Sequence, residues 1–306
     1  MTTGVLVMAY GTPSGPEHVE EYYTHIRRGR PPEPEQLADL VARYEAIGGI
    51  SPMARRTQAQ LDAVARALDG AEPGRWTVRL GQKHAAPFVE DGMAALAEAG
   101  VEHVVGVVLA PHYSSGSVGQ YLGRATAAAE EHGISFAGVR SWHLLPELID
   151  FQAAAVTSAL RDLPERSKVV FTAHSLPERT LVDDPYPDQL HESAAATAAA
   201  AGLGRWAGWG LGWQSAGRTP EPWRGPDILT VIDDLAATGR AEGILVVPQG
   251  FTSDHLEVRY DLDIEAAGVA GAAGLAFART PVVNDDPTVM AALAGLVRAT
   301  ADRELG

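Results

Sequence analysis

The architecture of this chain is indicated first by the segment Val169-Val170-Phe171-Thr172-Ala173-His174-Ser175-Leu176-Pro177. It begins as a short, mostly apolar run, typical of a buried parallel strand, and becomes a polar loop at His174. A second segment has the same form, because Val247-Pro248-Gln249-Gly250-Phe251 leads into Ser253-Asp254-His255-Leu256-Glu257. In an open parallel α/β sheet, ligands bind outside the carboxyl ends of the strands. We therefore expect His174 and Glu257 to face a common cleft.

A histidine and a carboxylate around one ligand are suited to metal and proton chemistry. A neutral imidazole binds a divalent cation or accepts a proton near neutral pH, and a carboxylate attracts the cation. The alternative for His174 is a core histidine that is hydrogen-bonded to the backbone. Pro177 disfavours helix in the residue before it, so it ends the strand sharply and favours the placement of His174 at the sheet edge.

The composition of the 306-residue chain excludes several classes of site. It has no cysteine, and therefore no disulfide, cysteine nucleophile or thiolate-bound zinc or iron–sulfur centre. The net charge of −15 predicts repulsion from nucleic acid and anionic membranes. No window reaches about 18–20 uninterrupted apolar residues, and Met1-Thr2-Thr3-Gly4 lacks the start of a signal peptide. We expect a cytoplasmic enzyme without a membrane span.

Apolar runs alternate with helical patterns, which predicts an α/β fold with parallel sheets. The expected strands are 4–9, 76–81, 103–110, 136–141, 168–173, 205–212, 243–248 and 275–280. The helical patterns include 34–46, 57–68, 89–99, 120–132, 148–163 and 187–201. Eight strands can close a barrel, but about 65 residues separate the first two, which is too irregular for one. Two four-stranded sheets are therefore expected.

The two sheets predict two domains with an active cleft between them. We expect the first domain to span residues 1–145 and the second 146–285, with a hinge near Leu144-Leu145-Pro146-Glu147. The final helical pattern, within 286–306, is expected to pack back on the first domain. No G-x-G-x-x-G or G-x-x-x-x-G-K-[ST] motif follows a strand. This absence argues against a nucleotide-dependent α/β enzyme, which is one rival interpretation.

Glu257 begins a series of carboxylates that continues at Asp261 and Glu265. On a helix, this i, i+4, i+8 spacing puts the three side chains on one face, where like charges repel weakly. One interpretation is a solvated acidic face, which is common in an acidic protein. The other is an acidic ladder from the surface to the site, which delivers a hydrated cation or carries protons away.

The densest basic spot lies in Thr24-His25-Ile26-Arg27-Arg28-Gly29-Arg30-Pro31-Pro32. Clustered arginines bind carboxylates or phosphates through paired hydrogen bonds, although a solvated loop is the plainer interpretation. Several aromatic residues, some of them beside Gly or Pro in expected loops, would suit a flat ligand; they are Tyr10, Tyr44, Tyr113, Tyr121, Trp213 and Trp223. Lys83-His84 and Pro111-His112-Tyr113 end two further strands on the same expected rim.

Taken together, these motifs resemble the ferrochelatase family, whose members insert ferrous iron into a porphyrin in haem synthesis. The resemblance runs nearly end to end, and the number of matches in order makes it specific. The matching segments are 6–13, 22–30, 43–52, 109–113, 173–177, 184–190, 212–215, 222–227 and 254–258. The chain is most similar to the soluble bacterial branch, which metallates coproporphyrin III rather than protoporphyrin IX.

The resemblance implies two Rossmann-like domains with the porphyrin between them. It implies that His174 and Glu257 are the catalytic and metal-binding pair and handle the iron and the pyrrole protons, with Tyr10 on the opposite face of the porphyrin. Contacts with the macrocycle and its propionates are implied for Arg27, Arg43, Tyr44, Ser51 and Tyr121. Asp261 and Glu265 would extend the acidic ladder, with Lys83 and His84 near it.

The resemblance implies two substrates, Fe²⁺ and coproporphyrin III, and no permanent cofactor. It also implies transient contacts with other haem-pathway enzymes. Coproporphyrin III has four propionates where protoporphyrin IX has two, and Arg27, Arg28, Arg30 and Ser51 would supply donors. The alternatives are a protoporphyrin IX ferrochelatase and a non-catalytic porphyrin or haem carrier with the same fold.

Overall fold

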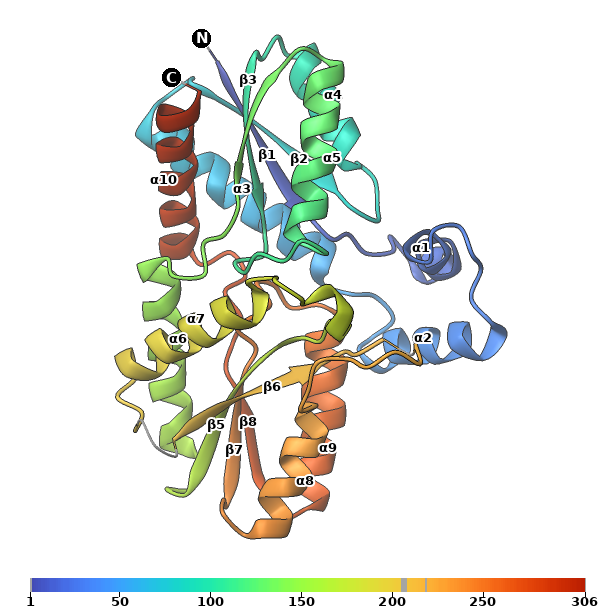
Figure 1. The fold of residues 1–306 in the computed structure, drawn as a ribbon, viewed down its shortest axis with the longest axis vertical. Helices are drawn as coiled ribbons and strands as arrows, with labels where there is room; N and C mark the ends of the chain where they lie inside the picture. Colours follow the sequence, from blue (N-terminus) through green and yellow to red (C-terminus); the bar gives the residue numbers. More distant parts are fainter. Residues whose placement is uncertain (1, 205–207, 218, 306) are drawn as a thin grey trace.

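The computed structural model describes residues 2–204, 208–217 and 219–305, and within them the chain forms two four-stranded parallel sheets (Figure 1). The first has the order β2-β1-β3-β4 and consists of β1 (Thr3–Ala9), β2 (Trp76–Gln82), β3 (His103–Val108) and β4 (Ser135–Val139). The second has the order β6-β5-β7-β8 and consists of β5 (Ser167–His174), β6 (Trp209–Gln214), β7 (Gly243–Val247) and β8 (Ala276–Arg279). The prediction of two parallel sheets is confirmed.

Helices cover both faces of each sheet. The α-helices of the described residues are α1 (Val19–Ile26), α2 (Pro34–Ala46), α3 (Met53–Ala71), α4 (Val89–Glu98), α5 (Val118–Glu131), α6 (Pro146–Ala159), α7 (Tyr186–Ala200), α8 (Ile228–Thr238), α9 (Ala267–Ala272) and α10 (Pro287–Glu304). Of these, α1 and α2 lie to one side of the sheets and cover neither (Figure 1). Local sequence explains several boundaries. Pro34 occupies the first turn of α2, where a missing N–H is tolerated, and the Asp286 side chain caps α10 by accepting from the N–H groups of Thr288 and Val289.

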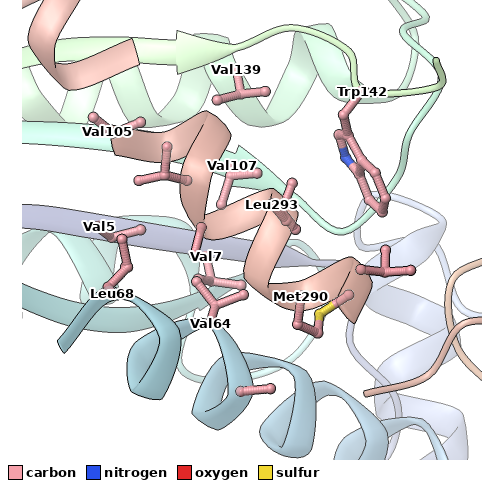
Figure 2. Close-up of a cluster of buried hydrophobic side chains, with 14 of the residues drawn as sticks. Val5, Val7, Val64, Leu68, Val105, Val107, Val139, Trp142, Met290 and Leu293 are labelled. Atoms are coloured by element: carbon pink, nitrogen blue, oxygen red, sulfur yellow. The ribbon is translucent and has the colours of Figure 1, made fainter. Parts of the chain in front are cut away.

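The first sheet has a hydrophobic layer on each face because alternate residues of a strand point to opposite sides. Val5 and Val7 of β1 pack with α3 and α10, as Figure 2 shows. Leu6 and Met8 pack on the other face, with α4 and α5. All four side chains are fully buried, and each contributes about 1.5–3 kcal/mol to stability relative to an exposed position.

The last helix, α10, follows β8 of the second sheet but packs against the first sheet (Figure 1). Its Met290 and Leu293 are fully buried in the same cluster as Val64 and Leu68 of α3 (Figure 2). The domain boundary at residues 145 and 146 stays a prediction.

The second sheet repeats this layered design. Val170 of β5 packs with α8 and α9, whereas Val169 and Phe171 pack with α6 and α7. The expected strand 205–212 begins later, at Trp209, and runs to Gln214; its expected first residues, 205–207, lie outside the described part of the chain. Trp213 is therefore a buried strand residue rather than a loop aromatic.

The acidic series lies on a different kind of helix from the one its spacing suggests. Glu257 precedes a π-helix that spans Val258–Ala266, in which hydrogen bonds run from i to i+5 and widen the turn. Such helices are usually single turns and are frequent at functional sites. An interval of four residues remains close to one full turn, so Asp261 and Glu265 stay near the side of the helix that Glu257 occupies.

Candidate functional site

Two adjoining cavities lie where the carboxyl ends of the two sheets meet. The inner cavity has a volume of about 320 Å³ and the outer one about 400 Å³, within the usual range for small-molecule sites. Their common wall consists of Tyr10, Met53, His174, His255 and Glu257. Tyr10 follows β1 and His174 ends β5, so the strand-end loops of both sheets contribute to this wall.

Glycines at two strand ends allow these loops to approach their neighbours closely. Gly11 has a φ of +91°, and a Cβ there would lie 2.8 Å from the Cβ of Ala85. A Cβ on Gly250 would lie 2.6 Å from the Cβ of Ala173. Only glycine fits such contacts without displacement. Gly11 thus sets the backbone next to Tyr10, and Gly250 sets the start of the loop that leads to Glu257.

His174 and Glu257 are brought together in the shared wall. Their Nε2 and Oε1 atoms lie 3.6 Å apart, and each side chain is about one third exposed (34% and 35%). The Nδ1 atom of His174 contacts the carbonyl oxygen of Ser175. A carbonyl can only accept, so Nδ1 carries a proton. In the neutral ring, the lone pair is therefore on Nε2, facing Glu257.

A second histidine, His255, lies on the other side of the Glu257 carboxylate. Its Nε2 is 3.5 Å from Glu257 Oε2, and its Nδ1 donates to the carbonyl oxygen of Ser253 at 3.0 Å. Burial alone would raise the pKa of Glu257, but His174, His255 and Ser215 outweigh it and hold that pKa at about 2. Burial alone would lower the pKa of His255, yet its hydrogen bond to Glu257 and the charge of that carboxylate raise the pKa.

Asp261, one helical turn further on, has a different environment. It is 6% exposed, accepts a hydrogen bond from Ser215 Oγ, and accepts one from an Arg43 guanidinium nitrogen at 3.2 Å. Burial and the neighbouring Glu257 carboxylate raise the pKa of Asp261 to about 6, although Ser215 and Arg43 oppose the change. Glu265 adds to this rise but lines neither cavity.

The expected porphyrin-binding residues divide between the two cavities. Tyr44, Ser51 and Arg27 line the outer one together with Arg43, and Tyr121 lines the inner one. Arg43 is already paired, because its Nε donates to Asp39 at 3.1 Å and a terminal nitrogen donates to Asp261. Arg28 and Arg30 are exposed and line neither cavity.

Tyr10 extends into the cleft with 40% of its surface exposed. Its ring packs on His84, with 4.6 Å between ring centroids. Desolvation raises the pKa of Tyr10, and the Glu257 carboxylate raises it further, so the phenol stays protonated at neutral pH. Burial lowers the pKa of Lys83 to about 8, helped by Arg124 and Arg28, and Lys83 lines the inner cavity beside Tyr121.

Sequence reasoning missed the role of Ser215 and the placement of His255. Ser215 follows β6 with a φ of +60° and directs its hydroxyl to Asp261. The sequence signal that could have placed Ser215 at the site is its position directly after Gly212-Trp213-Gln214, at the end of an expected strand. Within the described residues, no group of three or more His, Cys, Asp or Glu side chains is arranged to hold a metal ion. The Glu257 carboxylate, which lies between the Nε2 atoms of His174 and His255, is instead the group that attracts a proton or a cation.

Known proteins similar in sequence identify the family of this chain. The family model named Ferrochelatase matches residues 2–301. The coproporphyrin III ferrochelatase of Anoxybacillus flavithermus is 45% identical over 301 residues, which cover 96% of this chain and 95% of that protein. The coproporphyrin III ferrochelatase of Bacillus subtilis is 43% identical, with 96% of each chain covered.

Two solved structures share the fold at much lower identity. SirB from Bacillus subtilis with Fe³⁺ has a TM-score of 0.59 and 12% identity, covering 98% of this chain and 96% of that one. DR2241 from Deinococcus radiodurans has a TM-score of 0.56 and 15% identity, covering 100% of this chain and 56% of that one. The family model and the relatives above 40% identity extend over nearly the whole length, so this chain belongs to the ferrochelatase family.

Proposed function

We propose that this protein inserts ferrous iron into coproporphyrin III to give iron coproporphyrin, with release of the two pyrrole protons. The observation that carries the proposal is the Glu257 carboxylate between the Nε2 atoms of His174 and His255, in the wall between two cavities. The relatives named coproporphyrin III ferrochelatases support the choice of porphyrin.

In this proposal the two site residues have separate tasks. Glu257 has a pKa of about 2, so it stays ionised and attracts Fe²⁺ rather than holding a proton. His174, whose Nδ1–H is held by the Ser175 carbonyl oxygen, accepts a pyrrole proton at Nε2 as the metal enters. Asp261, whose pKa is about 6, exchanges protons near neutral pH and carries them away. Fe²⁺ is a substrate here, and no resident cofactor takes part.

The porphyrin would occupy the cleft with its ring against aromatic side chains and its propionates against basic groups. Tyr10 faces the ring, and Arg27 in the outer cavity is placed to bind a propionate. The main partner of Arg43 is Asp261, to which it donates a hydrogen bond. A contact between Arg43 and a propionate would be secondary to that pairing. Arg28 and Arg30 lie outside the cavities, so they act at the rim.

We propose that the enzyme works in the cytoplasm and meets the other haem-pathway enzymes only transiently. Among the described residues, no helix combines the length and apolar character needed to cross a membrane. The chain has no cysteine to bind an iron–sulfur cluster through thiolates.

The test is anaerobic turnover with Fe²⁺ and each of the two porphyrins, followed by absorbance. We expect insertion into both, with the higher kcat/KM for coproporphyrin III. A carrier with this fold would give no rate above the uncatalysed one, and a higher kcat/KM for protoporphyrin IX would contradict the substrate choice. His174→Ala should abolish insertion while porphyrin binding remains. His132→Ala, a change at an exposed position after α5, is the control and should leave turnover unchanged.

A further inference from the structure

The loop of residues 111–117 lies between β3 and α5, and it forms part of the inner cavity. Gly116 and Ser117 line that cavity, as does Tyr121 in the first turn of α5. The loop belongs to the half of the chain that carries the first sheet. It is fastened to the other half by hydrogen bonds at three positions, one just before α7 and two within that helix.

The first position is the carboxylate of Asp184, just before α7. Its Oδ2 accepts from the backbone N–H and the hydroxyl of Ser115, both at 2.7 Å, and from the hydroxyl of Ser114 at 3.4 Å. Its Oδ1 accepts from the N–H of Tyr186 at 3.0 Å. One carboxylate thus takes four donors from two halves of the molecule, and hydrogen bonds to a charged acceptor are the stronger kind.

The second and third positions lie further along α7. The side-chain oxygen of Gln189 accepts from the N–H of Tyr113 at 2.7 Å. Ser193 Oγ is 2.8 Å from Nε2 of the buried His112. The single hydroxyl proton of Ser193 goes to Gln249 or to the backbone carbonyl of residue 190, so the imidazole Nε2–H of His112 donates to Ser193.

The same helix start also contacts His174. Tyr186, whose N–H binds Asp184, directs its hydroxyl to the carbonyl oxygen of His174 at 3.3 Å. Its ring is 8% exposed and lines the inner cavity. A shift of α7 relative to the loop therefore moves both a wall of the porphyrin cavity and the backbone of His174.

We propose that Asp184 is a positioning residue for metal insertion: it fastens loop 111–117 to α7 and so sets the inner cavity and His174 in one arrangement. The proposal rests on the proposed function for its kinetic readout. Its physical basis is that a displacement of about 1 Å at a reacting group lowers a rate by roughly 100-fold. Asp184 touches no substrate in this account, because it lines neither cavity.

The experiment uses the full chain with three substitutions and one control. Asp184→Asn replaces one acceptor oxygen by an NH₂ group, Ser115→Ala removes one donor, and Tyr186→Phe removes only the hydroxyl that contacts His174. Asp188→Asn is the control, because Asp188 is exposed in the first turn of the same helix. The readouts are the Kd of coproporphyrin III by fluorescence quenching, kcat for Fe²⁺ insertion, and Tm.

We expect Asp184→Asn to raise the porphyrin Kd about tenfold and to lower kcat; tenfold corresponds to about 1.4 kcal/mol, near the lower end for one hydrogen bond to a charged group. Ser115→Ala should raise Kd several-fold and add little in the Asp184→Asn background, because both changes remove the same contact. Tyr186→Phe should lower kcat and leave Kd unchanged. Asp188→Asn should leave all three readouts as in the wild type.

Three results would overturn the proposal: Kd and kcat for Asp184→Asn equal to those of Asp188→Asn, a fall in Tm alone, or full additivity with Ser115→Ala. The Kd measurements need no turnover, so they test the fastening of the loop even if the wild type inserts no iron. A wild type that inserts no iron would contradict the proposed function and not the role of Asp184 in shaping the cavity.

Discussion

Replacement of Asp261 by asparagine should make the protein more stable at neutral pH. The pKa of Asp261 is raised from 3.8 to about 6, chiefly by burial and by Glu257. At 1.36 kcal/mol per pKa unit, its ionised form is disfavoured by about 3 kcal/mol in the folded state. The side chain is only 8% exposed, so solvent screens little of this. Asparagine keeps an acceptor for Arg43 but weakens the pairing, at a cost of about 1 kcal/mol. The net gain above pH 7 is about 2 kcal/mol.

The sign of the pH dependence makes this prediction specific. A carboxyl group whose pKa is raised on folding stabilises the protein fully below pH 3.8, and that contribution is lost as the pH rises through about 6. The gain from Asp261→Asn should therefore be present at pH 8 and absent, or slightly reversed, at pH 4.5. Urea denaturation at the two pH values measures it, with Asp188→Asn as a control that should show no such change. A difference between variant and wild type that is the same at pH 4.5 and pH 8 would show that Asp261 titrates normally.

Three further outcomes are expected. His255→Gln should destabilise the protein more at pH 6 than at pH 9, because Glu257 raises the pKa of His255 and its stabilisation is lost as the pH rises through that value; equal losses in urea denaturation at both pH values would contradict this. Leu293→Ala should lower the free energy of unfolding by about 2–5 kcal/mol, since Leu293 is fully buried between α10 and the first sheet; a loss below 1 kcal/mol in the same assay would show that α10 docks weakly. Arg27→Met should raise the KM for coproporphyrin III about tenfold with little change in kcat, whereas Arg28→Met, outside the cavities, should change KM far less; equal effects in steady-state kinetics would remove Arg27 from the site.

Much of the fold was predictable because it depends on local patterns. The apolar runs of the strands and the four-residue periodicity of the helices lie within short windows, and each strand is followed by a helix that must pack on the sheet. The meeting of His174 and Glu257 could be anticipated from the same rule, since loops at the carboxyl ends of parallel strands share one edge. The start of β6 was less predictable, because glycine and tryptophan around Trp209 mark no clear boundary.

Contacts between distant segments could not be predicted in this way. Arg43 is 218 positions from Asp261, and nothing near either residue indicates that α2 lies against the π-helix. The i, i+4 spacing after Glu257 fits an α-helix as well as a π-helix, so it does not distinguish them. A solvated loop was one interpretation of the arginine cluster, but the sequence could not show that Arg27 lines the outer cavity while Arg28 and Arg30 do not.

The amino-acid order by itself determined the two parallel sheets, the strand-end positions of Tyr10 and His174, and the absence of thiolate chemistry. Only the tertiary structure determined that Glu257 lies between two histidines, that Arg43 pairs with the buried Asp261, and that Asp184 joins the two halves. The physical reason is range. Backbone propensity and hydrophobic period act over a few residues, whereas charge and burial depend on which surfaces come within a few ångströms after packing.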